Sequence, residues 1–373
     1  MSSALSLYIH WPFCMSKCPY CDFNSHVSEK PIDEVRWRRA LLAELDHFAN
    51  KSVGRQLVSI FFGGGTPSTM APETTAALIE AARNYWPNPK YTEISLEANP
   101  SSVDASKLKD FAAAGVNRLS LGVQSFSNKS LKFLGREHSA KQATAAIELA
   151  NENFERYSFD LIYGLPEQSN KMWKNELNKA ISMAANHLSL YQLSIEAGTR
   201  FFADKVREAD SETGANLYTL THELTAQAGL NHYEISNYAR LGEECQHNVS
   251  IWRGGDYIGV GPGAHGRMSK DSETDALYQI YNPARWLKKV ENEGHATAKR
   301  TRLKSNERAE EIIMTGLRLG EGIEVRRFDS FLNNEALVRM EKGGFLIMEK
   351  GILRTTDTGQ LCLNSVISEL LSI

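Results

Sequence analysis

Short apolar runs alternate with amphipathic helical patterns over the first 235 residues of the chain. In the first helical pattern, Trp37, Leu41, Leu45 and Phe48 are spaced by three or four residues. Repeated β-α units predict a parallel sheet with its helices outside. Six units are fewer than the eight that close a barrel, so we expect an α/β fold with an open, partial (β/α)6 barrel. The expected strands lie at residues 5–10, 57–62, 91–97, 116–122, 157–163 and 187–195.

Residues beyond 235 follow a different pattern, which begins with a glycine-rich, aromatic stretch at residues 246–265. Later segments alternate, with helices at 283–293, 306–319, 335–342 and 361–371 and a hairpin of 345–348 and 352–355. The end of this pattern predicts a small α+β module that resembles a winged helix. We therefore divide the chain into a partial barrel at 1–235, a connecting segment at 236–300 and a winged-helix-like domain at 301–373.

The overall charge limits the classes of partner. The chain has 42 basic and 45 acidic residues, a net charge near −3, and an ordinary hydrophobic fraction of 42%. A winged-helix-like module suggests DNA binding. The acidic balance and the lack of a basic recognition helix speak against that function, and we expect no nucleic-acid partner.

Targeting signals and cysteine usage indicate the compartment. No apolar stretch approaches the roughly 20 residues that a membrane helix needs. The N-terminus lacks the charged, apolar and small-residue zones of a signal peptide. The chain has five cysteines, three of them clustered, which fits a reducing compartment better than a disulfide framework. We expect a cytoplasmic protein without a membrane span.

Three cysteines, Cys14, Cys18 and Cys21, follow the first expected strand with the spacing Cys-x3-Cys-x2-Cys. Iron–sulfur cubanes are normally held by one cysteine thiolate for each of four irons, so three thiolates leave one iron open. Structural zinc normally takes four ligands in a closed tetrahedron, which argues against that metal. The alternative to a reactive cluster is a structural protein that zinc or a cluster stabilises.

Polar and glycine features recur where the expected strands end. The second strand is followed by Gly63-Gly-Gly-Thr-Pro67, and the third ends at Glu97. Gln124 follows the fourth strand and Asp160 lies within the fifth. In barrels of this kind the active site lies at the carboxyl ends of the strands. We therefore expect these residues to gather around the cysteine loop.

The motifs resemble those of the radical S-adenosylmethionine (SAM) superfamily, whose defining motif is the tripled cysteine spacing. They are most similar to the oxygen-independent coproporphyrinogen oxidase family and, within it, to the HemW-type heme chaperone branch. The resemblance runs nearly end to end. It is carried by Tyr-Ile-His-Trp-Pro-Phe-Cys at 8–14, Cys-Pro-Tyr-Cys-Asp-Phe at 18–23, Gly-Gly-Gly-Thr-Pro-Ser at 63–68, Gly-Val-Gln-Ser-Phe at 122–126 and Asp-Leu-Ile-Tyr-Gly-Leu-Pro at 160–166.

The resemblance implies a TIM-like partial barrel and a [4Fe-4S] cluster on the three cysteines, with SAM chelating the open iron. The cofactor would carry the chemistry, and the protein would supply orientation and exclusion of water. The SAM-contact positions of the family correspond to Tyr8, Gly64, Gly65, Thr66 and Glu97. In the oxidase branch a second SAM is bound by the counterparts of Gln124, Arg136 and Asp160, and all three residue types are present here.

Two departures from the oxidase pattern favour the chaperone branch. The oxidases have a further cysteine two positions beyond the cluster motif, where this chain has Phe23. They also have a substantial extension before the first strand, whereas only thirteen residues precede Cys14 here. The expected function is therefore a heme chaperone that passes heme to acceptor proteins and lacks coproporphyrinogen oxidase activity. The alternative is an oxygen-independent coproporphyrinogen III oxidase, which converts two propionates to vinyl groups.

The heme ligand is expected in the stretch His247-Asn-Val-Ser-Ile-Trp252, which resembles the branch's His-Asn-x-x-Tyr-Trp motif with Ile251 in place of tyrosine. His247 is either the axial ligand or a loop histidine hydrogen-bonded to backbone. His265 and Cys245 are weaker candidates. Alternatively, Cys245 and Cys362 are unpaired, partly buried thiols.

For the other candidate site residues, the sequence allows both a functional role and a purely structural one. His10 either assists proton transfer in an oxidase or makes a structural hydrogen bond. Glu97 is either a SAM ligand or a cap of the following loop, and Arg136 is otherwise a charge at a helix entry. Asp160 would be costly to bury alone, so a partner or ligand is expected. Implied partners are heme, heme acceptors with which the protein associates peripherally, and a reductant such as flavodoxin or ferredoxin.

Overall fold

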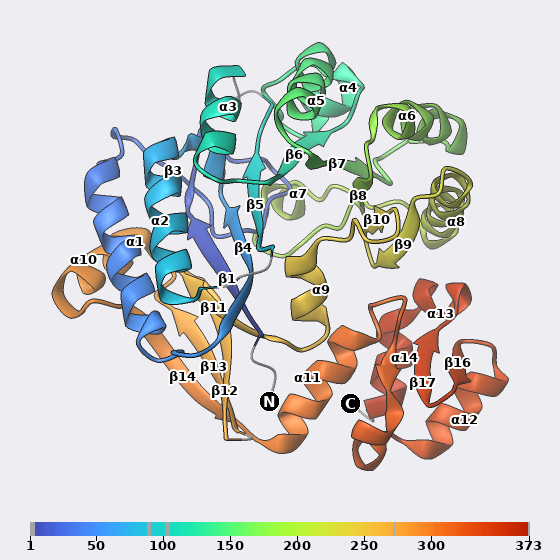
Figure 1. The fold of residues 1–373 in the computed structure, drawn as a ribbon. Coiled ribbons are helices and arrows are strands. Elements are labelled where there is room, and N and C mark those ends of the chain that lie inside the picture. Colours follow the sequence, from blue (N-terminus) through green and yellow to red (C-terminus); the bar gives the residue numbers. More distant parts are fainter. Residues whose placement is uncertain (1–3, 88–90, 101–104, 272, 372–373) are drawn as a thin grey trace.

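The structure is a computed structural model that describes residues 4–87, 91–100, 105–271 and 273–371. Its main feature is a sheet of twelve strands within the described residues, in the order β14-β13-β12-β11-β1-β4-β5-β6-β7-β8-β10-β9 (Figure 1). The six expected strands form its parallel centre, which confirms the predicted α/β core. They are β1 (Ala4–Trp11), β4 (Gln56–Gly64), β5 (Glu93–Ala98), β6 (Arg118–Gln124), β7 (Arg156–Tyr163) and β8 (His187–Gln192).

Helices cover the outer face of this curved sheet (Figure 1). Polar caps mark where they begin; for example, Ser139 and Gln142 form a capping box at the start of α5. The apolar positions of the first helical pattern are buried in the core, as expected. The helices are α1 (Glu34–Ala49), α2 (Pro72–Tyr85), α3 (Ala105–Ala113), α4 (Asn128–Phe133), α5 (Ala140–Asn153), α6 (Asn170–Met183), α7 (Arg200–Ala203) and α8 (Ser211–Gln227).

Further strands extend both edges of the parallel centre. β9 (Asn231–Glu234) and β10 (Asn237–Ala239) add to β8. At the other edge, β11 (Asp256–Val260) pairs in parallel with β1 and is followed by β12 (His265–Lys270), β13 (Glu273–Gln279) and β14 (Thr297–Leu303). The segment expected as a connection thus continues the same sheet, together with α9 (Gln246–Trp252) and α10 (Pro283–Glu293). β11 and β12 each contain a glycine, so their pattern resembled a loop.

The C-terminal part forms a smaller unit beside α9 (Figure 1). The expected helix, hairpin and helix are present around a three-stranded sheet in the order β15-β17-β16. This unit has its own apolar core, which includes Ile313, Leu353 and Val366. Its elements are α11 (Ser305–Gly316), β15 (Ile323–Glu324), α12 (Asn334–Lys342), β16 (Leu346–Glu349), β17 (Ile352–Thr355), α13 (Asp357–Leu361) and α14 (Leu363–Leu371).

Among the residues that the structure describes, no helix has both the length and the apolar content that crossing a bilayer requires.

One buried carboxylate connects α1 to the added edge of the sheet. Both oxygens of Glu44 accept hydrogen bonds, from Gly261 N at 2.8 Å, Trp286 Nε1 at 3.0 Å and Ala296 N at 2.7 Å. Burial raises the pKa of Glu44 to about 7, although these donors oppose the shift. A glutamate on an amphipathic helix pattern looks like a surface charge, so the sequence did not reveal this contact.

Replacing Glu44 by leucine keeps a side chain of similar size but leaves three buried N–H donors without an acceptor. Each such donor costs about 1–3 kcal/mol, so we expect the free energy of unfolding to fall by about 3 kcal/mol or more. Urea denaturation followed by circular dichroism measures the loss. Glu80→Leu, at an exposed position of α2, is the matched control and should change stability by less than about 0.5 kcal/mol. Equal stability of the two variants would contradict the role of Glu44.

Candidate functional site

The cysteine loop lies at the carboxyl end of β1. Cys14 is in β2 (Phe13–Cys14), which pairs with β3 (His26–Val27) and so closes the loop on itself. All three cysteines are partly exposed, and none forms a disulfide. Phe23, at the position where the oxidases have a further cysteine, is 59% exposed.

Each of the three cysteine sulfurs has a polar side-chain partner. The Thr66 hydroxyl donates to Cys14 Sγ at 3.3 Å, and Arg136 Nη1 donates to Cys18 Sγ at 3.4 Å. Cys21 Sγ lies 3.6 Å from the Ser25 hydroxyl. Hydrogen bonds of this kind stabilise thiolates that ligate a metal centre and tune its potential. The donor set therefore fits a cluster held by three cysteines.

Asn99 joins two of these partners and was not expected from the sequence. Its Nδ2 donates to the Thr66 hydroxyl at 3.1 Å, and its Oδ1 accepts from Arg136 Nη2. The same guanidinium donates to Gly122 O at 2.8 Å. A continuous chain of hydrogen bonds thus runs from Cys14 to Cys18 across the ends of β4, β5 and β6. An asparagine shortly after a strand carries no distinctive signal, which is why sequence reasoning missed it.

The glycine-rich turn packs directly against the cysteine strand. At Gly64, with φ of +110°, an added Cβ would lie 2.5 Å from the His10 ring, and at Gly65 it would lie 2.6 Å from Phe13 O. The turn also donates a backbone hydrogen bond from Thr66 N to Phe13 O at 2.8 Å. Glycine is required here because two segments meet without room for a side chain.

His10 is held between the barrel and the cysteine loop. Its Nε2 donates to Asn24 O at 2.9 Å, so its Nδ1 accepts from the Tyr8 hydroxyl at 3.1 Å. Burial lowers the pKa of His10 to about 4, which keeps the ring neutral. The structural hydrogen bond that the sequence allowed is present. A role of His10 in proton transfer stays a prediction.

Two buried carboxyl groups, Glu97 and Asp160, lie inside the barrel and interact electrostatically. Glu97 accepts a hydrogen bond from Gly64 N at 3.3 Å, and Asp160 accepts one from the Ser120 hydroxyl at 3.3 Å. Burial and the Asp160 carboxylate raise the pKa of Glu97 to about 8, and burial raises the pKa of Asp160 to about 6. Gln124 ends β6 with φ of +65°. The expected SAM-pocket residues therefore share one end of the barrel, and Asp160 has the partner that its burial required.

His247 lies at the other end of the barrel, on α9. Its side chain is 4% exposed, its Nδ1 lies 2.9 Å from the Ser59 hydroxyl, and its ring stacks on Phe61 with centroids 4.9 Å apart. Burial lowers the pKa of His247 to about 4. A heme ligand at this position would require α9 to leave the barrel. The role of His247 as a heme ligand therefore stays a prediction for a state in which α9 has moved.

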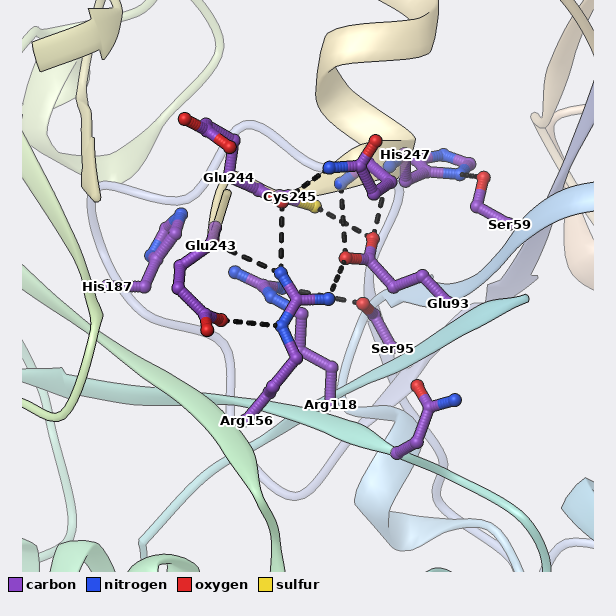
Figure 2. Close-up of polar contacts among 12 residues, drawn as sticks. Ser59, Glu93, Ser95, Arg118, Arg156, His187, Glu243, Glu244, Cys245 and His247 are labelled. Carbon is purple, nitrogen blue, oxygen red and sulfur yellow. Dashed lines mark hydrogen bonds and ion pairs between the residues drawn. The ribbon is translucent and has the colours of Figure 1, made fainter. Parts of the chain in front are cut away.

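Glu93 anchors the start of α9 (Figure 2). Its carboxylate accepts hydrogen bonds from Gln246 N and His247 N, both at 3.1 Å, and from Arg156 Nη1 at 2.9 Å. Burial alone would raise the pKa of Glu93, but the guanidinium groups of Arg118 and Arg156 hold it below its usual value. The negative charge of Glu93 also interacts favourably with the positive end of the helix dipole at the start of α9. Sequence analysis singled out none of these anchors.

The weaker heme-ligand candidates lie apart from one another. Cys245 is buried and its thiol donates to Glu93 Oε1 at 3.4 Å; burial raises the pKa of this thiol to about 12. Cys362 is a free, partly buried thiol in the C-terminal unit. His265 is exposed at the start of β12. Both cysteines are unpaired, as expected, and Cys362 is partly buried, whereas Cys245 is fully buried.

Within the described part of the chain, no group of three or more histidine, cysteine, aspartate or glutamate side chains is arranged to hold a single metal ion. A cubane differs from a single ion because its ligands bind separate corners.

Two family models match the chain. The Radical SAM superfamily matches residues 8–180, and the HemN C-terminal domain matches residues 303–362. The first match covers the cysteine loop and most of the parallel strands, and the second covers most of the C-terminal unit.

Curated relatives match nearly the whole chain. "Radical S-adenosyl methionine domain-containing protein 1, mitochondrial" of Bos taurus is 38% identical over 390 residues, covering 100% of this chain and 88% of that protein. "Heme chaperone HemW" of Escherichia coli is 42% identical over 266 residues, covering 71% and 70%. The protein of the same name from Haemophilus influenzae is 34% identical over 363 residues, covering 96% and 94%.

A solved structure shares the fold. The coproporphyrinogen III oxidase HemN from Escherichia coli, described as a radical SAM enzyme, superposes with a TM-score of 0.84. The alignment covers 100% of this chain and 91% of that one, at 22% sequence identity. At this identity the likeness establishes the architecture alone.

Replacing Thr66 by valine should make the reduction potential of a bound cluster more negative. A hydrogen bond donated to a cysteine sulfur offsets the charge that reduction adds, and valine removes the donor. A redox titration of anaerobically reconstituted protein, followed by electron paramagnetic resonance, measures the shift.

Thr66→Ser keeps the hydroxyl and should restore the wild-type potential. Thr144→Val, whose hydroxyl donates to Ala140 O within α5, is the control and should leave the potential unchanged. An unaltered potential in Thr66→Val with a fully assembled cluster would contradict the assigned hydrogen bond.

Proposed function

This chain belongs to the radical SAM superfamily and, within it, to the group that contains the HemW proteins, and from this premise we propose that it binds heme and delivers it to acceptor proteins. The observation that carries the proposal is near full-length similarity to relatives named as heme chaperones, at 34% identity over 96% of the chain in one case. Phe23 stands where the oxidase pattern has a cysteine, and its phenyl ring is exposed, which supports the chaperone over the oxidase.

We further propose that Cys14, Cys18 and Cys21 hold a [4Fe-4S] cluster whose open iron is chelated by SAM. The polar partner at each sulfur supports this ligand set. When bound and reduced, the cluster supplies an electron to the SAM sulfonium. The chain's own part is to orient SAM and keep water away. The proposed SAM contacts are Tyr8, Gly64, Gly65, Thr66, Glu97, Gln124, Arg136 and Asp160.

The proposed acid–base properties of this pocket follow from its buried carboxylates. Because the pKa of Glu97 is raised to about 8, its carboxyl group is largely protonated at neutral pH when no ligand is present. A cationic ligand in the barrel would favour the ionised form of both Glu97 and Asp160. SAM carries a sulfonium and an ammonium group, so its charge suits this pair.

A second candidate function is the radical decarboxylation of coproporphyrinogen III. The shared architecture with HemN and the presence of Gln124, Arg136 and Asp160 favour it. In that case His10 would assist proton transfer. Both functions would need a reductant such as flavodoxin or ferredoxin, and we place the chaperone in the cytoplasm with peripheral access to its acceptors.

Anaerobically reconstituted protein should bind hemin at one molecule per chain and should produce no protoporphyrinogen. Hemin titration followed by Soret absorption gives the stoichiometry. A parallel incubation with coproporphyrinogen III, SAM and dithionite, analysed by chromatography, tests turnover, with HemN as the positive control. If no hemin binds, the proposed chaperone function is ruled out. If protoporphyrinogen forms, the protein is an oxidase instead.

The His247→Ala variant should bind hemin with the wild-type stoichiometry, because the imidazole is enclosed between Ser59 and Phe61 while α9 is in place. Soret titration of the variant measures this. His187→Ala, which removes another buried histidine of the barrel, controls for loss of stability. If only the His247 variant loses hemin while its circular dichroism is unchanged, His247 is the ligand and α9 must open.

A further inference from the structure

A groove on the outer face of the sheet is separate from the cysteine loop. It has a volume of about 940 Å³ and lies between the end of α1 and the strands β12, β13 and β14. Figure 1 shows these strands at the lower left, below α1. Arg55 lines the groove and donates to Ala4 O at the start of β1, whereas the cysteine loop follows the end of β1. The groove and the cysteine loop therefore lie at opposite ends of the sheet.

The floor of the groove is apolar. Phe48 from α1 and Leu277 from β13 are buried beneath it, and Met268 from β12 is partly exposed in it. Val53, which is 80% exposed, forms part of one wall. A volume of this size is in the range of pockets that bind cofactors and other small molecules. A small inorganic anion would leave the apolar side chains of the floor in contact with water. The floor therefore points to a ligand with a large hydrophobic surface.

The rim of the groove is cationic. Two of its arginines already have carboxylate partners: Arg55 pairs with Asp256 at 2.6 Å, and Arg300 pairs with Asp275 at 2.5 Å. The lysines are exposed around the same opening, on a chain whose net charge is near −3. The cationic lining residues are Lys51, Arg55, Lys270, Lys299 and Arg300, and the acidic ones are Asp271 and Asp275.

Two cations, Lys51 and Arg300, lie near two imidazoles at the end of the groove close to α1. The rings of His47 and His295 stack with centroids 3.8 Å apart, and Lys51 Nζ donates to His47 Nε2 at 2.7 Å. Burial, His295 and Lys51 lower the pKa of His47 to about 4, and burial and the nearby Arg300 lower the pKa of Lys51. An imidazole, not a carboxylate, accepts the hydrogen bond from Lys51. A ligand carboxylate would give Lys51 the charged acceptor that the imidazole does not supply.

We propose that this groove binds a flat, apolar dicarboxylate of the tetrapyrrole class, with its ring facing the Phe48–Met268–Leu277 floor and its carboxylates paired with the rim lysines. The identity of the ligand as heme rests on the proposed function. The groove is open to solvent, whereas His247 is enclosed in the barrel. Heme can therefore be taken up in this groove without any movement of α9.

The test combines affinity with the location of bound hemin. Hemin is titrated into the full-length protein and into the double variant Lys51→Glu/Lys270→Glu. We expect the affinity of the double variant to fall at least about tenfold, the amount that the loss of one charged hydrogen bond produces. Lys174→Glu, at an exposed position of α6, makes a single charge reversal away from the groove and should bind as the wild type does.

Chemical acetylation followed by mass spectrometry then locates the ligand. Hemin and metal-free protoporphyrin should both protect Lys51, Lys270 and Lys299, since the carboxylates and the ring are common to them, while Lys174 stays reactive. Inorganic phosphate at the same concentration should not protect these lysines. Equal protection by phosphate would show a nonspecific anion site and would overturn the inference.

The two proposals fail in different ways. If the wild type binds one hemin but the double variant binds it equally well and no rim lysine is protected, heme binds elsewhere. The chaperone function then stands and the groove assignment falls. If the wild type binds no hemin, the proposed function falls and the assignment with it. Circular dichroism of each variant confirms that an altered affinity does not come from unfolding.

Discussion

The candidate site depends on one close approach between two backbone segments. The glycine turn after β4 lies so near the cysteine strand that a Cβ at position 65 would sit 2.6 Å from Phe13 O. This contact places Thr66 beside Cys14, although the two residues are 52 positions apart in the chain. From Thr66 the hydrogen bonds continue through Asn99 to Arg136 and so to Cys18. The geometry of the sulfur ligands is therefore set by the lack of side chains at two glycines.

The interior of the barrel is largely polar, which is unusual for a space enclosed by strands. At one end are the carboxyl groups of Glu97 and Asp160, whose raised pKa values suit a cationic ligand. At the other end, Glu93 binds the start of α9, and Arg118 and Arg156 keep its carboxylate ionised, so that α9 closes the barrel. Each of the six central strands contributes one buried serine to the sheet: Ser6, Ser59, Ser95, Ser120, Ser158 and Ser189. One end of the barrel thus holds two buried carboxyl groups, and the other end is closed by the protein's own helix.

The parallel strands and the cysteine loop were predictable because both have a local signature. Strands buried in a parallel sheet appear as short apolar runs, and three cysteines at fixed spacing are rarely accidental. β11 was missed because its five residues lie among glycines and its partner, β1, is some 250 positions away. Asn99 and Glu44 act through long-range contacts that no local pattern records. His247 was expected either as the axial ligand or as a loop histidine hydrogen-bonded to backbone; its motif forms the helix α9, and its ring lies beside the Ser59 hydroxyl.

The place of β1 in the sheet has a consequence for how the protein is made. β1 lies between β4 and β11, so one of its edges stays unpaired until residues 256–260 have left the ribosome. The loop that carries the cysteines is also tied to late residues, because Asn24 donates a hydrogen bond to Pro262 O. A nascent chain that ends before this point has the sulfur ligands without their final support. The proposed cluster should therefore be inserted after more than two thirds of the polypeptide has been translated.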